Sequence, residues 1–286
     1  MNKNFKTIAI ISSFDPITKE EIKIIKNNKN CFFNFYFLEG EESIENRINM
    51  IKIIIDGDNT SFFDYKKSHK FDEDKIYKIT NKSKNNLKEL KSIKTDPKVV
   101  EYILKNRLYF MKKIINFYKP ERLEHAISVA ILANKIASSN HIKNNGEYFI
   151  AGILHDLGKN TNNEDAIKII DEKFNKFLPL EPWEYHQFVG AYLAEKLFPK
   201  VPKNCINAIK FHTTGKSKMT KIEKIIFSAD DIEPLRNYDS SYLINACLKN
   251  YDFGFRYTLR EVIAFNSGNG NKPSKLGNEC QKQYID

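Results

Sequence analysis

The sequence predicts an α+β protein in which a small α/β domain, residues 1–95, precedes a larger domain made of helices alone. Two observations support this prediction. Up to residue 95, short apolar runs typical of strands alternate with segments whose apolar residues have helical spacing. From residue 121 onward the apolar patterns are helical, and no convincing strand or hairpin is found. The two parts are therefore expected to fold differently.

The first part begins with an apolar run at residues 8–11 that is typical of a buried strand. A Ser-Ser-Phe-Asp-Pro segment breaks this run, and residues 19–26 then have the pattern of a helix. An aromatic-rich strand is expected at 31–38, and a second helix at 43–54 with a serine as its N-cap. Because strands that alternate with helices usually pair in parallel, we expect a small parallel sheet. The polar, lysine-rich residues 64–92 are expected to form loops.

A single helix at 96–118 is predicted to link the two parts. Asp96-Pro97 has the residues of a helix start, and the apolar residues that follow have helical spacing. The helical domain proper is expected at 119–266. The remaining residues, 267–286, are polar and contain glycine, proline and lysine, which predicts a flexible tail.

Composition excludes several classes of protein. The net charge is +10, from 46 basic and 36 acidic residues. This charge would attract a polyanion, but generic lysine richness is the simpler explanation. Because no basic stripe with interleaved aromatic residues is present, no specific nucleic-acid partner is predicted.

The four cysteines form no C-x-x-C pair, which argues against a disulfide framework or a zinc–cysteine site. No apolar run approaches the roughly 18 residues of a membrane span. A cytoplasmic protein without a membrane partner is expected.

The residues most informative about function are four of the chain's six histidines together with two aspartates. They are His125, His155, Asp156, His186, His212 and Asp230. Each lies in a segment that is predicted to be helical, and where the pattern is clear it shares the apolar face of its helix. Burial of an ionised aspartate without a partner costs several kcal/mol. Two such aspartates beside four histidines therefore predict a metal centre with nitrogen and carboxylate ligands from several helices.

The alternative is that these are ordinary core residues. A single histidine on an apolar face is more often a hydrogen-bonded core residue than a ligand. His155 and Asp156 are adjacent, so they point about 100° apart within a helix and can share a site only near a helix end, which Gly158 supplies. The joint pattern over separate helices is what favours metal ligands. His69 and His141 have no such setting and are predicted to lie at the surface.

The pattern resembles the HD superfamily of metal-dependent phosphohydrolases, whose signature is His…His-Asp…Asp. The similarity is greatest to its YqeK-type branch, the symmetric diadenosine tetraphosphate hydrolases, and covers about residues 115–265. It is carried by Arg122-Leu-Glu-His125, Ile153-Leu-His-Asp-Leu-Gly-Lys159, His186-x-x-Val-Gly-Ala-Tyr192, Phe211-His-Thr-Thr-Gly215 and Lys224-Ile-Ile-Phe-Ser-Ala-Asp-Asp-Ile-Glu-Pro234. The resemblance implies an all-α HD-domain helical bundle for the second domain.

The resemblance also implies two divalent metal ions. The family aspartate follows an alanine directly, which selects Asp230 over its neighbour Asp231 as a ligand. One metal would be held by His125, His155, Asp156 and Asp230, and the second would share Asp156 and add His186 and His212. A bridging hydroxide would attack phosphorus, with Asp156 as the shared carboxylate. The resemblance favours iron, and manganese, cobalt or zinc also suit the ligands.

Further residues are expected to bind the substrate. They are Arg122, Lys159, Thr213, Thr214, Gly215 and Arg236. Lys159 could hold a nonbridging oxygen during catalysis, although a solvated lysine near a helix C-terminus is an equal alternative. Residues 213–215 end a helix and offer hydroxyl and backbone N–H groups to phosphate, and Arg236 is a weaker candidate of the same kind.

The start of the chain resembles a different family, the nicotinate mononucleotide adenylyltransferases. Residues 8–17 are similar to its first strand and its Phe-Asp-Pro motif. However, Ile11 and Ser12 stand where that family has glycines, and Thr18 and Glu21 stand where it has the histidines that bind ATP phosphates. A carboxylate at this place would repel a triphosphate. We interpret the first domain as a truncated, degenerate, Rossmann-like remnant without adenylyltransferase activity.

The leading hypothesis is a metal-dependent hydrolase that cleaves diadenosine tetraphosphate symmetrically into two ADP. One alternative is an HD-domain nucleotidase or nucleoside triphosphate hydrolase of other specificity, because the ligands determine the metals and not the nucleobase. Another is a catalytically silent nucleotide-binding module. The expected partner is a dinucleoside polyphosphate or another nucleotide substrate, and a homodimer is an open option.

Overall fold

The computed structural model describes residues 6–55, 57–67, 71, 73–79, 87, 89–143, 146–270 and 272–286. The chain divides into two compact units. The first unit comprises Met1–Lys88 and Ile93–Met111, and the second comprises Glu89–Ser92 and Lys112–Asp286. Among the described residues, no helix has both the length and the apolar character required to cross a membrane.

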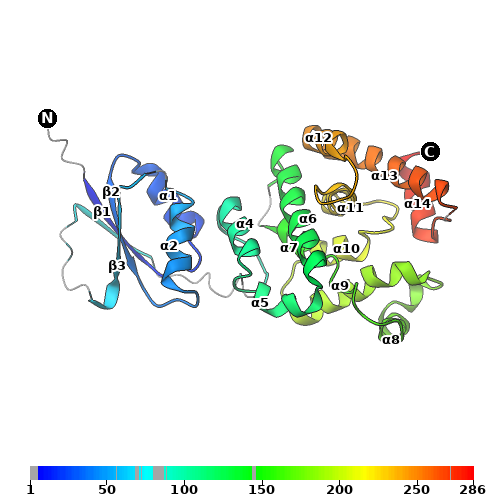
Figure 1. Cartoon of the computed structure of the whole chain (residues 1–286), viewed down its shortest axis with the longest axis horizontal. Coiled ribbons are helices and arrows are strands. Elements are labelled where there is room, and N and C mark those ends of the chain that lie inside the picture. Colours follow the sequence, from blue (N-terminus) through cyan, green and yellow to red (C-terminus); the bar gives the residue numbers. More distant parts are fainter. Residues whose placement is uncertain are drawn as a thin grey trace. The chain divides into compact units, whose positions relative to one another are not determined.

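The first unit contains a four-stranded parallel sheet in the order β3-β2-β1-β4. The strands are β1 (Thr7–Ser12), β2 (Phe32–Phe37), β3 (Thr60–Asp64) and β4 (Lys75–Lys78). Ile10 of β1 lies opposite Phe35 of β2 on one side and Tyr77 of β4 on the other. Two crossover helices, α1 (Lys19–Asn27) and α2 (Ile44–Lys52), join the first three strands and cover the same face of the sheet (Figure 1). The predicted α/β unit with parallel pairing is confirmed.

Residues 64–92 are not all loop, so that prediction was wrong for β4. This strand has only four residues, three of them exposed, so it lacks the apolar alternation that identifies a strand in a sequence. Pairing with residues 8–11 of β1 determines its conformation. On the face opposite α1 and α2, Tyr65 and Phe71 of the β3–β4 connection pack on a cluster that contains Ile11 and Tyr36.

The predicted linking helix at 96–118 is broken. The structure has α4 (Pro97–Lys105), α5 (Met111–Ile114) and the 3-10 helix η2 (Ile115–Phe117). Asp96 caps α4 as expected, accepting a hydrogen bond from the Lys98 backbone N–H at 3.0 Å. The helix stops because Arg107 and Tyr109 have φ of +56° and +55°, which an α-helix of L-residues cannot accommodate. The Tyr109 hydroxyl instead donates to Asp15 at 2.6 Å, a contact far away in sequence.

The described residues of the second unit form helices and the turns between them, with no strand, as predicted. The helices are α6 (Pro120–Ser139), α7 (Glu147–Leu154), α8 (Asn163–Lys173), η3 (Asn175–Phe177), η4 (Pro182–Glu184), α9 (Tyr185–Leu197), α10 (Lys203–Lys210), α11 (Lys221–Ile232), α12 (Ser241–Lys249), α13 (Tyr251–Gly268) and α14 (Lys275–Tyr284). Helix α7 is buried along its length and packs against α6, α10 and α11. Gly152 permits the close approach to α6, since a Cβ there would lie 2.5 Å from the Ala130 Cα. Figure 1 shows α10 and α11 next to α6 and α7.

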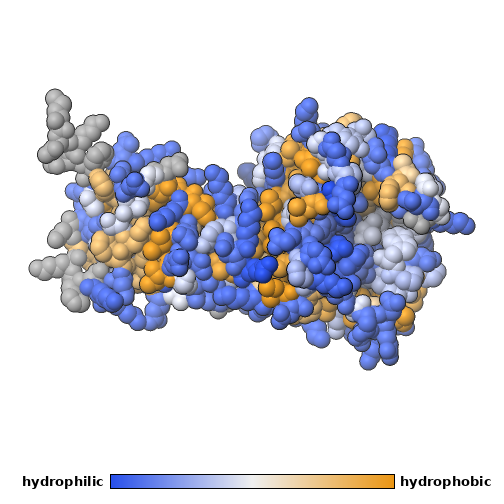
Figure 2. Space-filling model, viewed as in Figure 1, coloured by the Kyte–Doolittle hydropathy of each residue, from blue (hydrophilic) through white to orange (hydrophobic). Residues whose placement is uncertain are grey.

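The prediction of a flexible tail at 267–286 was wrong. Residues 275–284 form α14, which buries Cys280 and Tyr284 against a cluster that contains Met219 and Phe255. The Tyr284 hydroxyl accepts a hydrogen bond from the Met219 backbone N–H at 2.6 Å. The apolar signal was weak: Leu276, Cys280 and Tyr284 have i, i+4 spacing in a segment that is otherwise mostly polar. Figure 2 shows that hydrophilic residues dominate the viewed face of the second unit, with hydrophobic residues scattered among them.

Candidate metal centre

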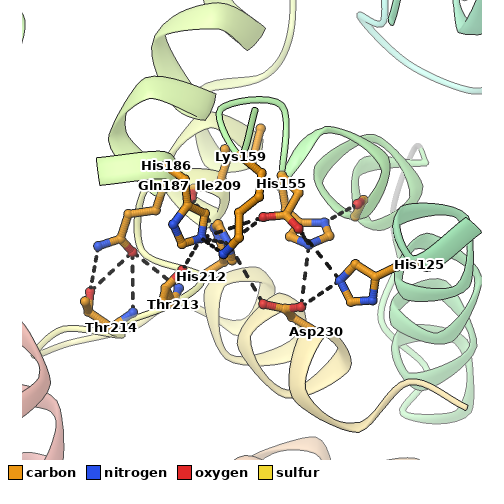
Figure 3. Close-up of polar contacts among 12 residues, drawn as sticks. His125, His155, Lys159, His186, Gln187, Ile209, His212, Thr213, Thr214 and Asp230 are labelled. Carbon is orange, nitrogen blue, oxygen red and sulfur yellow. Dashed lines mark hydrogen bonds and ion pairs between the residues drawn. The ribbon is translucent and has the colours of Figure 1, made fainter. Parts of the chain in front are cut away.

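All six predicted metal ligands come together in the second unit. Figure 3 labels the four histidines and Asp230. His125 lies on α6, His155 ends α7, Asp156 follows it, His186 is on α9, His212 follows α10, and Asp230 is on α11. The turn after α7 lies directly against α9, because a Cβ at Gly158 would be 2.4 Å from the His186 carbonyl oxygen. Gly158 therefore allows the chain to bring Asp156 next to the α9 ligand.

One half of the cluster surrounds Asp230. Its Oδ1 lies 3.0 Å from the Nε2 of His125 and 3.5 Å from the Nε2 of His155. Asp156 contributes its Oδ2 to the same half, 3.5 Å from the His155 Nε2 and 3.9 Å from the His125 Nε2. Two imidazole nitrogens and two carboxylate oxygens thus face one another, which is a donor set suited to a divalent transition metal.

The other half surrounds the second oxygen of Asp156. Its Oδ1 lies 3.7 Å from the Nε2 of both His186 and His212, and these two nitrogens are 3.2 Å apart. Groups of potential ligand atoms within 4.8 Å of one another are formed by His125, His155 and Asp230 and by His155, Asp156 and His212. These groups share His155, yet an imidazole Nε2 has a single lone pair. The two carboxylate oxygens of Asp156 can serve two ions, so Asp156 is the better shared ligand.

Burial makes the cluster dependent on positive charge. His155 is 0% exposed and Asp156 is 2% exposed. Burial alone would raise the pKa of Asp156, but the His155 and His212 imidazoles hold it well below its usual value. Burial would likewise raise the pKa of Asp230, but the neighbouring His155 and His125 imidazoles hold it well below its usual value. The buried Asp156 and the half-buried Asp230 are therefore favoured in their ionised forms, and they need protons or metal ions on the nitrogens between them.

The imidazoles show where positive charge is needed. Burial would lower the pKa of His155, but Asp156 and Asp230 raise it to about 10. Its Nε2 is buried and has no hydrogen-bond partner among the described residues. By contrast, burial and the adjacent His212 lower the pKa of His186 to about 3. This imidazole is therefore neutral, and its Nε2 can offer a lone pair to a metal ion. An unpartnered nitrogen directed at two carboxylates, close to the neutral imidazole of His186, fits a metal-binding site.

All four imidazoles are oriented in the same way. Each directs Nε2 into the cluster and places Nδ1 against an acceptor outside it. Three use the carbonyl oxygen three residues earlier: His155 with Gly152 at 2.7 Å, His186 with Trp183 at 2.9 Å and His212 with Ile209 at 2.7 Å. His125 differs, because its Nδ1 lies 3.0 Å from the carboxylate of Glu233. Such outer hydrogen bonds are typical of metal-bound histidines.

Sequence reasoning assigned no role to Glu233, although it belongs to a motif that carries the resemblance. Glu233 is 1% exposed, and its second oxygen accepts from the Leu235 N–H at 2.7 Å. Nothing in its local sequence distinguishes it from a solvated acidic residue after a helix. Its position depends on the packing of α11 against α6, which brings residues 108 positions apart into contact.

Replacing Glu233 with glutamine is expected to weaken metal binding by roughly tenfold to a hundredfold, the usual effect of losing such an outer partner. Glutamine keeps the shape but removes the charge that makes the His125 imidazole a stronger donor. Metal affinity is measured by competition with a chelator. Glu172→Gln, at an exposed position of α8, is the matched control, and equal affinities for both variants would contradict this role.

The three cationic side chains predicted to bind substrate all lie beside metal ligands. Arg122 Nη1 is 2.9 Å from Asp156 Oδ2, and Arg236 Nη2 is 2.8 Å from Asp230 Oδ1. Arg236 also donates twice to the Asp230 backbone carbonyl, so it is held closer to the cluster than its weaker standing in the sequence suggested. Lys159 Nζ lies 3.5 Å from His186 Nε2. Each arginine side chain is about one-third exposed, and Lys159 is exposed.

The prediction for residues 213–215 needs correction. The backbone N–H groups of Thr213 and Thr214 donate to the side-chain oxygen of Gln187 at 3.3 and 3.4 Å, and that of Gly215 donates to Phe211. These groups are therefore used within the protein and are not offered to phosphate. Thr214 is buried, and Gly215 (φ +63°) lies so close to α14 that a Cβ would be 2.6 Å from the Cys280 Sγ. Only the Thr213 hydroxyl reaches the cluster, 2.9 Å from His186 Nε2.

His141 is exposed at the end of α6, whereas His69 lies outside the described residues. In the first unit, Glu21 is 0% exposed at the start of α1. Its carboxylate accepts hydrogen bonds from the Ser12 hydroxyl at 2.6 Å, from the Thr18 N–H at 2.7 Å and from the Thr18 hydroxyl. Backbone N–H groups at a helix N-terminus form a natural anion site. Here the Glu21 carboxylate forms a capping box with Thr18, and the N–H of Lys19, the first residue of α1, donates to the Lys94 carbonyl.

Comparison with known proteins agrees with this description. The model of the HD domain family matches residues 122–235. A "Probable nicotinate-nucleotide adenylyltransferase/Ap4A hydrolase" of Mycoplasma genitalium is 28% identical over 89% of this chain and 79% of its own length. A "Bis(5'-nucleosyl)-tetraphosphatase, symmetrical" of Halalkalibacterium halodurans is 32% identical over 44% of this chain and 70% of its own length. The chain spans about half the length of some other curated relatives.

A solved structure is also similar. It is described as a "predicted HD superfamily hydrolase involved in NAD metabolism" from Clostridium acetobutylicum. The TM-score is 0.54 at 26% identity, covering 61% of this chain and 94% of that one. The helical fold and the His/Asp cluster thus define an HD-domain hydrolase. Within that class, the chain belongs to the family that includes the symmetrical bis(5'-nucleosyl)-tetraphosphatase of Halalkalibacterium halodurans.

Proposed function

We propose that the second unit hydrolyses diadenosine tetraphosphate symmetrically, giving two molecules of ADP. The observation that carries the proposal is the arrangement of Asp156. One of its oxygens faces His125 and His155, and the other faces His186 and His212. A buried carboxylate placed in this way can bridge two metal ions roughly 3.5–4 Å apart, as two-metal phosphohydrolases require. The names of the relatives support the choice of substrate.

Six residues would hold the two ions. His125, His155 and Asp230 would hold one, His186 and His212 the other, and Asp156 would bridge them. When bound, the ions supply Lewis acidity and lower the pKa of a coordinated water. Iron is our choice for both, by resemblance, and the mixed imidazole and carboxylate set accommodates it together with manganese, cobalt and zinc.

The cationic side chains account for binding of a polyphosphate. Arg122 contacts Asp156 from one half of the cluster, and Lys159 contacts His186 in the other half. Positive groups thus lie at both ends of the ligand cluster, where they can bind successive phosphoryl oxygens of an extended chain. Arg236 keeps Asp230 in its orientation through both the backbone and the side chain of that residue. The Thr213 hydroxyl can donate a hydrogen bond to one more phosphoryl oxygen.

The proposal is tested with the purified full chain, diadenosine tetraphosphate and each candidate metal, with iron supplied under anaerobic conditions. ADP as the sole nucleotide product is expected, and ATP plus AMP would show asymmetric cleavage instead. ATP, ADP and AMP are assayed in parallel, because faster turnover of one of these would favour a nucleotidase or triphosphate hydrolase. Absence of turnover by the wild type, or unchanged turnover in His155→Ala, would remove the proposed function.

The first unit is expected to show no adenylyl transfer. Glu21 places a buried negative charge at the start of α1, where an ATP phosphate would need N–H donors and positive charge. Pyrophosphate release from nicotinate mononucleotide and ATP is therefore expected to stay at the background level of a protein-free reaction. A catalytically competent adenylyltransferase assayed in the same buffer is the positive control. Pyrophosphate release above background that depends on nicotinate mononucleotide would overturn the prediction.

A further inference from the structure

Gln187 of helix α9 is a buried polar residue that is neither a proposed metal ligand nor a proposed substrate contact. Gln187 directly follows the ligand His186 and is 0% exposed. Its amide lies against the turn that follows α10 (Figure 3). The Oε1 atom accepts hydrogen bonds from the N–H groups of Thr213 and Thr214, and Nε2 lies 3.2 Å from the Thr214 hydroxyl. The Gln187 side chain therefore accounts for the hydrogen bonds between α9 and the backbone N–H groups of this turn.

Two consecutive residues of α9 thus contact the same turn. Neighbouring residues of a helix point about 100° apart, so His186 can face the ligand cluster while Gln187 faces the backbone of the turn. Thr213 lies between them. Its N–H donates to Gln187, and its hydroxyl is 2.9 Å from the Nε2 of His186. The hydroxyl is consequently held at a defined place at the edge of the proposed metal centre.

We propose that Gln187 is a positioning residue that places the Thr213 hydroxyl for contact with the substrate phosphate. This inference rests on the proposed phosphohydrolase function. Thr214 is buried, and the turn's N–H groups are already used, so the half-buried Thr213 is the residue of this turn that can still contact substrate. Without the Gln187 oxygen, two N–H groups would lack acceptors, and the turn would have to move to satisfy them.

The metal ligands should be much less affected. The His212 imidazole is oriented by the Ile209 carbonyl, and that of His186 by the Trp183 carbonyl, and neither contact involves Gln187. An effect of Gln187 on substrate binding can therefore be separated from an effect on the metals. If Gln187 only satisfied buried donors, its replacement would lower thermal stability, and its effect on KM would not depend on whether Thr213 is present.

A double-mutant cycle tests the inference. Gln187→Met keeps the length of the side chain and removes its hydrogen bonds. In the metal-loaded enzyme it is expected to raise KM for diadenosine tetraphosphate about tenfold, as loss of a hydrogen bond to a charged phosphate would. The metal content should stay at the wild-type value, and kcat should change far less than KM. In a Thr213→Val background, the same replacement is expected to leave KM within about twofold.

A KM effect of equal size in both backgrounds would overturn the proposal, as would an effect confined to melting temperature or metal content. Gln187→Asn provides a second variant if Gln187→Met does not fold, because it keeps an amide but shortens its reach, and the same rise in KM is expected. Absence of turnover by the wild type counts against the proposed function alone. The cycle is then measured with whichever nucleotide the wild type does hydrolyse.

Discussion

Replacing Asp156 with asparagine is expected to remove both metal ions and to lower kcat/KM for diadenosine tetraphosphate by roughly a thousandfold. The carboxylate is 2% exposed, and its two oxygens face different histidine pairs, so both proposed sites lose a negatively charged ligand at once. Metal ions contribute several kcal/mol to such reactions, and each 1.4 kcal/mol corresponds to about a factor of ten in rate. Metal content per chain and steady-state kinetics measure the effect.

The matched control is Asp171→Asn, which makes the same chemical change at an exposed position of α8. This variant should retain the metal and the activity of the wild type. Circular dichroism of Asp156→Asn is needed to show that the helices persist. A folded Asp156→Asn protein that keeps two metal ions and at least a tenth of the wild-type kcat/KM would refute the bridging role.

Replacing His186 with alanine is expected to remove one metal ion and leave the other. His186 and His212 face only one oxygen of Asp156, whereas His125, His155 and Asp230 form the opposite half of the cluster. The occupancy should fall from two ions to one per chain. We expect kcat/KM to fall about a hundredfold, a smaller loss than for Asp156→Asn because one ion keeps its ligands.

His141→Asn is the control for this experiment, since His141 is exposed and has a φ of +55°, which asparagine tolerates. It should bind two ions. Loss of both ions in His186→Ala would mean that the two sites bind metal only together. Retention of both ions with normal kinetics would show that His186 is not a ligand.

The ligand cluster shows how far the sequence could predict this site. Four histidines and two aspartates on helical apolar faces indicated a buried cationic centre, because few other arrangements tolerate buried carboxylates. The structure brings all six residues together. Glu233 and Gln187 had no such signal. Each is a single polar residue near a helix end, and its importance depends on a partner 108 or 26 positions away.

In the fold, too, features with a local sequence signal were predicted, and features that depend on distant contacts were not. The parallel β1–β2 pair and the helices of the second unit follow from apolar periodicity, which acts over a few residues. The break after α4, strand β4 and helix α14 could not be predicted in this way. Tyr109 leaves the helical path where its hydroxyl contacts Asp15, β4 exists through pairing with β1, and α14 is ordered by packing on Met219 and Phe255.

By itself, the sequence determined which chemical groups are available and on which helices they lie, because residue type and periodicity are local properties. It therefore predicted a metal-binding helical domain and an N-terminal unit without adenylyl transfer activity. Only the tertiary structure decided which oxygen of Asp156 faces which histidines, which hydroxyl of the 213–215 turn is accessible, and that the Glu21 carboxylate is buried against Ser12 and Thr18. These features are distances between side chains on separate elements, and they arise only when the helices and strands pack.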